Sequence, residues 1–169
     1  NSRLCRRAIT VVSVLLAVSP AYADIHLRTI ALSGTPAPGT NGAVYAGFES
    51  IVINNVGDVA YTGYLAPGIG DVTATNNDGV WRSNASGGTD LIARRGSVAP
   101  GTGGERFAGF DIGTFSHDIR PLLNDAGQVA FHVDLETGGY GVWGPDAQNE
   151  LTLVHFDEQP LPGPDGLVN

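Results

Sequence analysis

The stretch from Ile30 to Thr40 reads IALSGTPAPGT, and the chain repeats it twice at a fixed spacing. The second copy, from Ile92 to Thr102, reads IARRGSVAPGT, and a decayed third copy, from Val154 to Pro164, reads VHFDEQPLPGP. Successive copies begin 62 residues apart. A fixed period of this length predicts tandem units, each of which buries its apolar face against its neighbours.

Each full unit contains four short apolar segments separated by turn residues, and no stretch after residue 23 has helical periodicity. In the first unit the predicted strands are Val44–Ile53, Asp58–Leu65, Gly79–Ser83 and Asp90–Arg94. In the second unit they are Phe107–Ile112 (with a continuation at Arg120–Leu123), Gln128–Leu135, Gly141–Gly144 and Leu151–Phe156. With 24 glycines and 10 prolines between short strands, the sequence predicts an all-β fold of antiparallel four-stranded repeats.

Two anchors recur in both units. The tripeptide Gly-Val-Trp ends at Trp81 and again at Trp143, 62 residues later, and a large aromatic residue at a fixed repeat position favours packing between units. The turn from Asn54 to Gly57 recurs from Asn124 to Gly127 at a separation of 70. This difference predicts an eight-residue insertion at about residues 113–120 of the second unit.

Four strands with one tryptophan per unit are typical of a propeller blade. The segment Ile25–Leu32 then reads as a lone fourth strand ahead of the first complete unit. Two blades cannot close a ring, so we expect an N-terminal fragment of a larger β-propeller. The predicted organisation is a signal peptide at 1–23, a lone strand at 24–40, complete repeats at 41–102 and 103–164, and the start of a truncated repeat at 165–169.

The repeated phrase Asn-x-x-Gly-x-Val-Ala-aromatic, from Asn54 to Tyr61 and from Asn124 to Phe131, is followed by Gly-Val-Trp and by a strand that leads into Ala-Pro-Gly. In this order the motifs resemble a repeated domain of exported bacterial proteins of unknown function that often carry a C-terminal PEP-CTERM sorting anchor. The resemblance covers nearly all of residues 25–163. It implies tandem propeller-like repeats on an exported protein and supplies no catalytic residues.

The N-terminus predicts export. Three arginines precede an apolar run from Ala8 to Val18, and the small-x-small triplet ending at Ala23 follows. This order is typical of a cleaved secretory signal peptide, and a run of about eleven residues is too short to cross a bilayer, which takes about twenty. We expect the mature protein to be secreted, periplasmic or attached to the cell surface.

Removal of that segment leaves six arginines against 17 acidic residues, a formal charge of −11. Nucleic acid is therefore an unsuitable partner, because its binding depends on clusters of Lys and Arg. The only cysteine, Cys5, lies in the signal segment, so the mature chain has no disulfide, thiol nucleophile or thiolate metal site. We expect no cofactor, with calcium as the one candidate cation.

Three places could carry chemistry. The insertion brings Ser116, His117, Asp118 and Arg120 together in sequence, which suits either a loop-borne site or an ordinary polar loop. His132 and Asp134 share one face of a strand and could form a binding site or a satisfied polar pair. The turns Asn76–Gly79 and Asn124–Asp125 offer hard oxygen ligands for calcium, although turn formation also explains their composition.

Three functional hypotheses remain open. The first is a non-enzymatic structural or binding module outside the cell, whose partner is a polysaccharide or another surface protein. The second is a carbohydrate-active or other hydrolytic propeller in which Asp111, Asp118 and Asp134 meet at the mouth of the ring. The third is an adhesion module stabilised by calcium.

Overall fold

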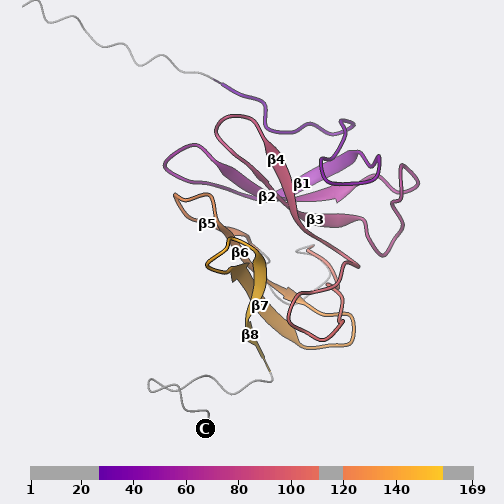
Figure 1. Cartoon of the computed structure of the whole chain (residues 1–169). Coiled ribbons are helices and arrows are strands. Elements are labelled where there is room, and N and C mark those ends of the chain that lie inside the picture. The colour runs from indigo at the N-terminus through magenta and orange to yellow at the C-terminus, as the bar shows by residue number, and fades with distance from the viewer. Residues whose placement is uncertain (1–26, 111–119, 158–169) are drawn as a thin grey trace, which may run out of the picture.

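The computed structural model describes residues 27–110 and 120–157, which form two four-stranded antiparallel sheets in chain order (Figure 1). The first sheet contains β1 (Tyr45–Ile53), β2 (Val59–Leu65), β3 (Asp78–Ser83) and β4 (Thr89–Arg94). The second contains β5 (Leu122–Leu123), β6 (Val129–Asp134), β7 (Tyr140–Pro145) and β8 (Leu151–Phe156). Helices are absent from the described residues, so none there could cross a membrane as a helix.

The prediction of an all-β fold with antiparallel four-stranded units is confirmed. Seven of the eight strands lie within one residue of their predicted bounds. The exception is the first strand of the second unit, predicted at Phe107–Ile112. Residues 107–110 form no strand there, and Phe107 makes only an isolated bridge to Leu135. The two-residue strand β5 forms within the predicted continuation and pairs with β6, and residues 111–119 lie outside the described residues.

The two tryptophans occupy matching surroundings within their own sheets, and Trp143 also packs against the first sheet, as the predicted packing between units requires, whereas the cluster of Trp81 contains only the first unit and the segment before it. Trp81 and Trp143 are fully buried, and each indole Nε1 donates to a carbonyl oxygen 43 residues earlier, that of Pro38 at 2.9 Å or of Pro100 at 3.0 Å. Each indole also stacks on an aromatic ring of the neighbouring strand, at interplanar angles of 13° and 19°. The Pro-Gly part of each repeated phrase therefore packs on the sheet that follows it in the chain.

The turn at Gly39 illustrates why the phrase keeps its glycine. Gly39 has a φ of 75°, and a Cβ built there would lie 2.6 Å from the Leu91 Cβ. Gly34 has a φ of 82° with no atom within 4 Å of a built Cβ, so it carries backbone strain without the clash. We expect Gly39→Ala to lower the free energy of unfolding by about 2–3 kcal/mol and Gly34→Ala by about 1 kcal/mol. Urea unfolding of both variants measures the difference, and equal losses would contradict this account of the phrase.

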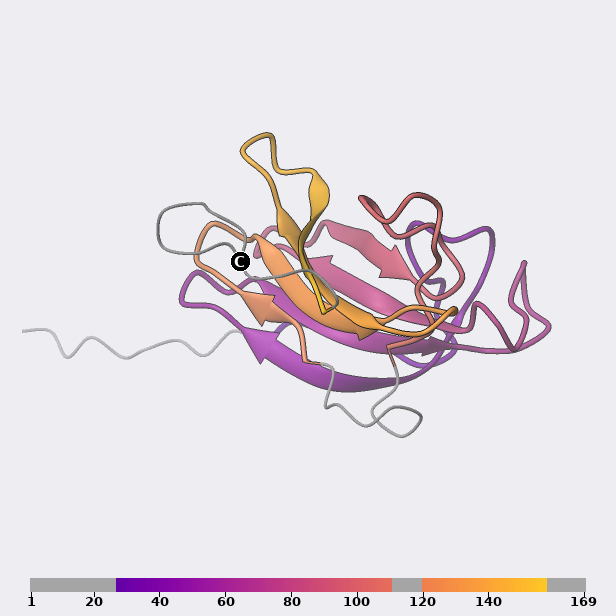
Figure 2. The same cartoon turned by 90° about the horizontal axis from the view of Figure 1, so that it is seen from below.

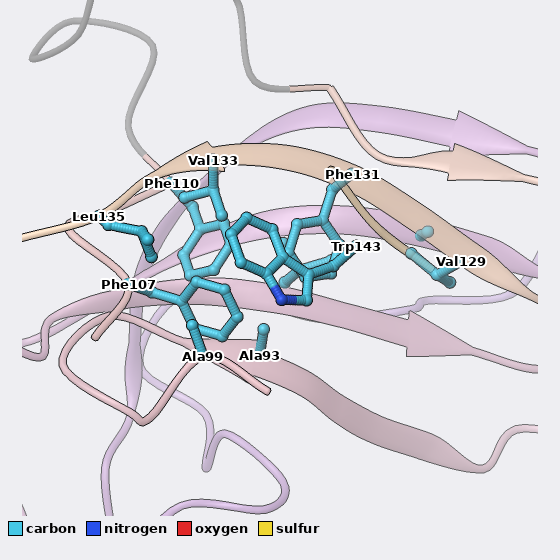
Figure 3. Close-up of a cluster of buried hydrophobic side chains, with 11 residues drawn as sticks. Ala93, Ala99, Phe107, Phe110, Val129, Phe131, Val133, Leu135 and Trp143 are labelled. Carbon is cyan, nitrogen blue, oxygen red and sulfur yellow. The ribbon is translucent and has the colours of Figure 1, made fainter. Parts of the chain in front are cut away.

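The second sheet lies over the first, as Figure 2 shows from below. The interface between them, called the seam here, contains Ala60, Val80 and Ala93 of the first sheet. Against them pack the rings of the second unit, where Trp143 is surrounded by Phe107, Phe110 and Phe131 (Figure 3). Burial of these aromatic rings against small side chains supplies the main apolar stabilisation of the seam.

Polar contacts also cross the seam. The Asn55 backbone and side-chain amides donate to the Asp125 carboxylate at 2.9–3.1 Å. These hydrogen bonds, the side-chain amide first, lower the pKa of Asp125. Deeper in the seam, the buried Asp78 carboxylate accepts the Phe110 N–H at 2.6 Å and lies 3.5 Å from the Arg95 guanidinium. The seam is therefore fixed in register as well as buried.

The opposite face of the first sheet has its own aromatic cluster, built on Tyr45, Tyr61 and Trp81. Residues 27–32 run over this cluster, where Ile30 and Ala31 are partly buried. Residues 27–32, part of the lone strand predicted at Ile25–Leu32, belong to no strand ladder in the described part of the chain, and the lone fourth strand stays a prediction. A segment becomes a strand only beside a hydrogen-bonding neighbour, and none of the described strands runs next to it.

The two tyrosines of this cluster give the fold a dependence on alkaline pH. Their hydroxyls lie 2.9 Å apart, and burial, the largest cause, raises the pKa of both Tyr45 and Tyr61. The unfolded chain thus releases these protons near pH 10, before the folded chain does. Stability present below about pH 10 is expected to fall as pH rises above it. Urea midpoints measured across this range should fall less in a Tyr45→Phe/Tyr61→Phe variant; an equal fall would contradict the assignment.

Candidate functional site

The insertion of the second unit enters the fold at a position where the first unit has a β-bulge. The β1–β2 register shifts between Glu49 and Val52, and Ser50 adopts a positive φ of 46°. Bulges of this kind interrupt strand pairing and can accept added chain without disturbing the rest of the ladder. In the second unit the residues that match this bulge and most of the predicted insertion, 111–119, lie outside the described residues, and β5 follows them.

Most of the loop-borne candidates lie outside the described residues. This holds for Ser116, His117 and Asp118, and also for Asp111 of the hydrolytic hypothesis. Arg120 is described and exposed, just before β5. The loop-borne site and the convergence of the three acidic residues therefore stay predictions.

His132 and Asp134 do share a strand face, as the sequence predicts. They alternate along β6 with Phe131 and Val133, whose side chains are buried in the seam. Both candidates are half-buried and point to the opposite side, away from the seam. The first-sheet equivalent of His132 is Thr62, which is 2% exposed. The second sheet thus presents a surface that the first sheet buries.

Strand register brings further polar side chains beside these two. Val142 pairs with His132 on one side and with His155 on the other, so two imidazoles flank one valine. In the next row, Asp134 pairs with Tyr140. We call this surface the β6–β8 face: His132, Asp134, Tyr140, Val142, His155 and the adjoining Asp157.

Tyr140 and Asp157 interact at the edge of this face. The Asp157 backbone N–H donates to the Tyr140 carbonyl oxygen at 2.9 Å. A side-chain hydrogen bond with Asp157, followed by the carboxylate charge, raises the pKa of the Tyr140 hydroxyl. The ring itself remains 37% exposed. An accessible aromatic ring beside carboxylates and imidazoles offers both a stacking surface and hydrogen-bond partners to a ligand rich in hydroxyl groups.

Sequence reasoning missed Tyr140 and Asp157 and gave no role to His155. Their grouping depends on which residues face each other across strands, and the Gly-Val-Trp anchor was the available signal. Tyr140 directly precedes that tripeptide, at the position of Asp78 in the first unit. The same comparison shows Asp157 in place of Arg95 and His155 in place of Ala93. The β6–β8 face therefore departs from the repeat at several seam positions together.

The turns proposed for calcium use their oxygen atoms for other contacts. The Asn124 Oδ1 accepts from the backbone N–H groups of Ala126 and Gln128, while Asp125 accepts from Asn55. Asp78 accepts from Phe110, and the Asn76 Oδ1 accepts from the Thr73 N–H. Within residues 27–110 and 120–157, no three His, Cys, Asp or Glu side chains converge to hold a metal ion.

A cleft runs along the seam where the second sheet meets β3 and β4. Its volume is about 200 Å³, and its polar lining includes Arg82, Gln128 and Glu150. The Arg82 guanidinium donates to the Gly127 carbonyl at 2.8 Å and pairs with Asp90 at 2.6 Å. The first contact joins the two sheets, whereas the second lies within the first sheet, so Arg82 in the cleft already serves the seam.

Searches of curated proteins and of solved structures gave no match. The repeat architecture and the two aromatic clusters fall almost entirely within one family match, which spans residues 22–165. The chain belongs to this family, a family of unknown function designated DUF7453.

Proposed function

We propose that the protein is an exported, non-enzymatic β-repeat protein that binds polysaccharide through the β6–β8 face. In this proposal residues 1–23 are a cleaved export signal, and the two sheets are consecutive units of a propeller-like array on a protein with a PEP-CTERM-type anchor. The site of action is the cell surface or the space beyond it.

One observation carries the proposal: the β6–β8 face has two histidines where the first sheet buries small side chains. Thr62 and Ala93, both buried, correspond to His132 and His155. A face that served only to pack another sheet would retain the small residues, because buried imidazoles lose hydration and need partners. Histidines at these two positions, beside Asp134 and the exposed Tyr140, suit a hydrated ligand instead.

The strongly negative charge of the mature chain disfavours a negatively charged ligand. With 17 acidic residues and six arginines after residue 23, an anionic polymer would be repelled, especially at low ionic strength. We therefore expect a neutral or cationic polysaccharide. Sugar hydroxyls would donate to the Asp134 carboxylate, and the sugar ring would pack on Tyr140.

Affinity electrophoresis and titration calorimetry test the proposal. The probes are dextran, galactomannan and chitosan oligosaccharides as neutral and cationic ligands, with alginate as the anionic comparison. We expect binding to a neutral or cationic probe, weakened about tenfold or more by Tyr140→Ala and by Asp134→Ala. The control Ile53→Ala, at a 71% exposed position on the other sheet, should bind like the parent.

Two outcomes would contradict the proposal. One is saturable hydrolysis of any of these probes, of a peptide or of an ester, which would make the protein an enzyme. The other is binding that the Tyr140→Ala and Asp134→Ala variants leave unchanged, which would place the ligand elsewhere. Export has its own readout, since N-terminal sequencing of secreted protein should begin at Asp24.

A further inference from the structure

We infer that residues 27–32 are a docking strand for a further sheet of this same repeat, which they would complete as its fourth strand. The inference comes from comparing two copies of the repeated phrase within this chain. Ile30-Ala31 stands 62 residues before Ile92-Ala93 in the repeated phrase, and both dipeptides pack against the aromatic cluster of the sheet that follows them. The inference rests on the stacking of repeats in the proposed function and is independent of its ligand.

The two dipeptides differ in strand pairing. Ile92 and Ala93 belong to β4, which is hydrogen-bonded to β3 and packs against the Trp143 cluster. Ile30 and Ala31 lie on the Trp81 cluster in the equivalent position, but residues 27–32 belong to no ladder within the described residues. They hold the place of a fourth strand whose three companion strands are absent from the described chain.

Exposure marks where those companion strands would lie. Ile53 pairs with Val59 and is 71% exposed, whereas its second-sheet equivalent, Leu123, pairs with Val129 and is partly buried against the first sheet. Ile51 is likewise 67% exposed. At these positions the first sheet covers the second sheet, whereas the matching part of the first sheet is exposed to solvent.

An apolar groove of about 120 Å³ occupies this open area. It is lined by Ile30, Ala31, Phe48, Ile51, Val59 and Tyr61. Its walls join the docking segment to the uncovered part of the first sheet. A sheet that covered the groove would therefore also lie beside residues 27–32.

The occupant that fits both features is a sheet of the same repeat rather than an unrelated apolar peptide. The existing seam shows that β-branched and small residues at the positions of Val52, Ala60 and Val80 cover such an aromatic face. The β3–β4 ladder also supplies a register, because Val80 pairs with Ala93. By the 62-residue offset, Ala31 would pair with the valine of the incoming Gly-Val-Trp strand, as an added strand pairs with a sheet edge.

A truncated copy of this chain provides the acceptor. Ending the chain at Asn149 removes β8 and frees the β7 edge, which carries Gly-Val-Trp, while residues 27–32 remain as donor. We expect this truncated chain to self-associate head to tail, with a mass by light scattering at least twice that of one chain, while the intact chain stays monomeric. The same truncation with Ile30→Asp should remain monomeric, and the matched surface control Val98→Asp should still associate.

Three results would overturn the inference: a folded truncated chain that stays monomeric, association that Ile30→Asp leaves unchanged, or intact chains that associate as strongly as truncated ones. The last would mean that a second copy docks with β8 in place. If near-ultraviolet circular dichroism shows that the truncated chain is unfolded, Leu153→Asp in the full chain replaces it, because Leu153 pairs β8 with Trp143. Polysaccharide binding by the full-length chain with Ile30→Asp, which keeps β8 and the whole β6–β8 face, separates failure of this inference from failure of the proposed function.

Discussion

Replacing Trp143 by alanine is expected to lower the free energy of unfolding by about 3–5 kcal/mol, the cost of deleting a fully buried large aromatic side chain. Trp143 is 0% exposed and packs on two phenylalanine rings, at centroid distances of 5.0 Å to Phe107 and 6.4 Å to Phe131. The cavity would open in the middle of the seam, where both sheets contribute walls. Urea unfolding followed by far-ultraviolet circular dichroism measures the loss.

Trp143→Phe is the matched control. It keeps a ring in the cluster and removes the indole N–H that donates to the Pro100 carbonyl at 3.0 Å. It should therefore cost less than the alanine variant. Trp81→Ala should cost about as much as Trp143→Ala, because the two indoles have equivalent partners. A loss below about 1 kcal/mol for either alanine variant would contradict the packing role of the tryptophans.

Ala60→Asp is expected to have an effect of similar size for a different reason. Ala60 is 0% exposed on β2 and faces the second sheet across the seam. A carboxylate there would be buried without a partner charge, at a cost of about 3–5 kcal/mol. Ile53→Asp, on the neighbouring strand of the same sheet but 71% exposed, should change stability by less than about 0.5 kcal/mol.

Local patterns were sufficient to predict the sheets. Turn residues such as Asn54 and Gly57 end one strand and begin the next, and Gly-Val-Trp fixes the third strand of each unit. Both signals depend on a few neighbouring residues, so contacts with distant parts of the chain have little effect on the turns and strands that they predict. The burial of both tryptophans followed from the same repeat.

Interactions between distant parts of the chain were harder to predict. The pairing of Val142 with His155 depends on a register shift next to Trp143 in the β7–β8 ladder, which no local pattern reveals. The state of residues 27–32 also depends on distant chain, because the segment has the composition of a fourth strand and lacks a neighbouring strand among the described residues. Strand composition alone does not specify a partner.

The most direct test of the central claim, that the two sheets share one seam, places the perturbation in one sheet and the reporter in the other. In a Trp81→Phe background, Trp143 is the only tryptophan and reports on the second sheet. The measurement is the urea midpoint of Trp143 fluorescence with and without Ala60→Asp in the first sheet. A shared seam predicts that the substitution lowers this midpoint markedly, whereas an unchanged Trp143 transition would show that the sheets are stable independently and would contradict the account.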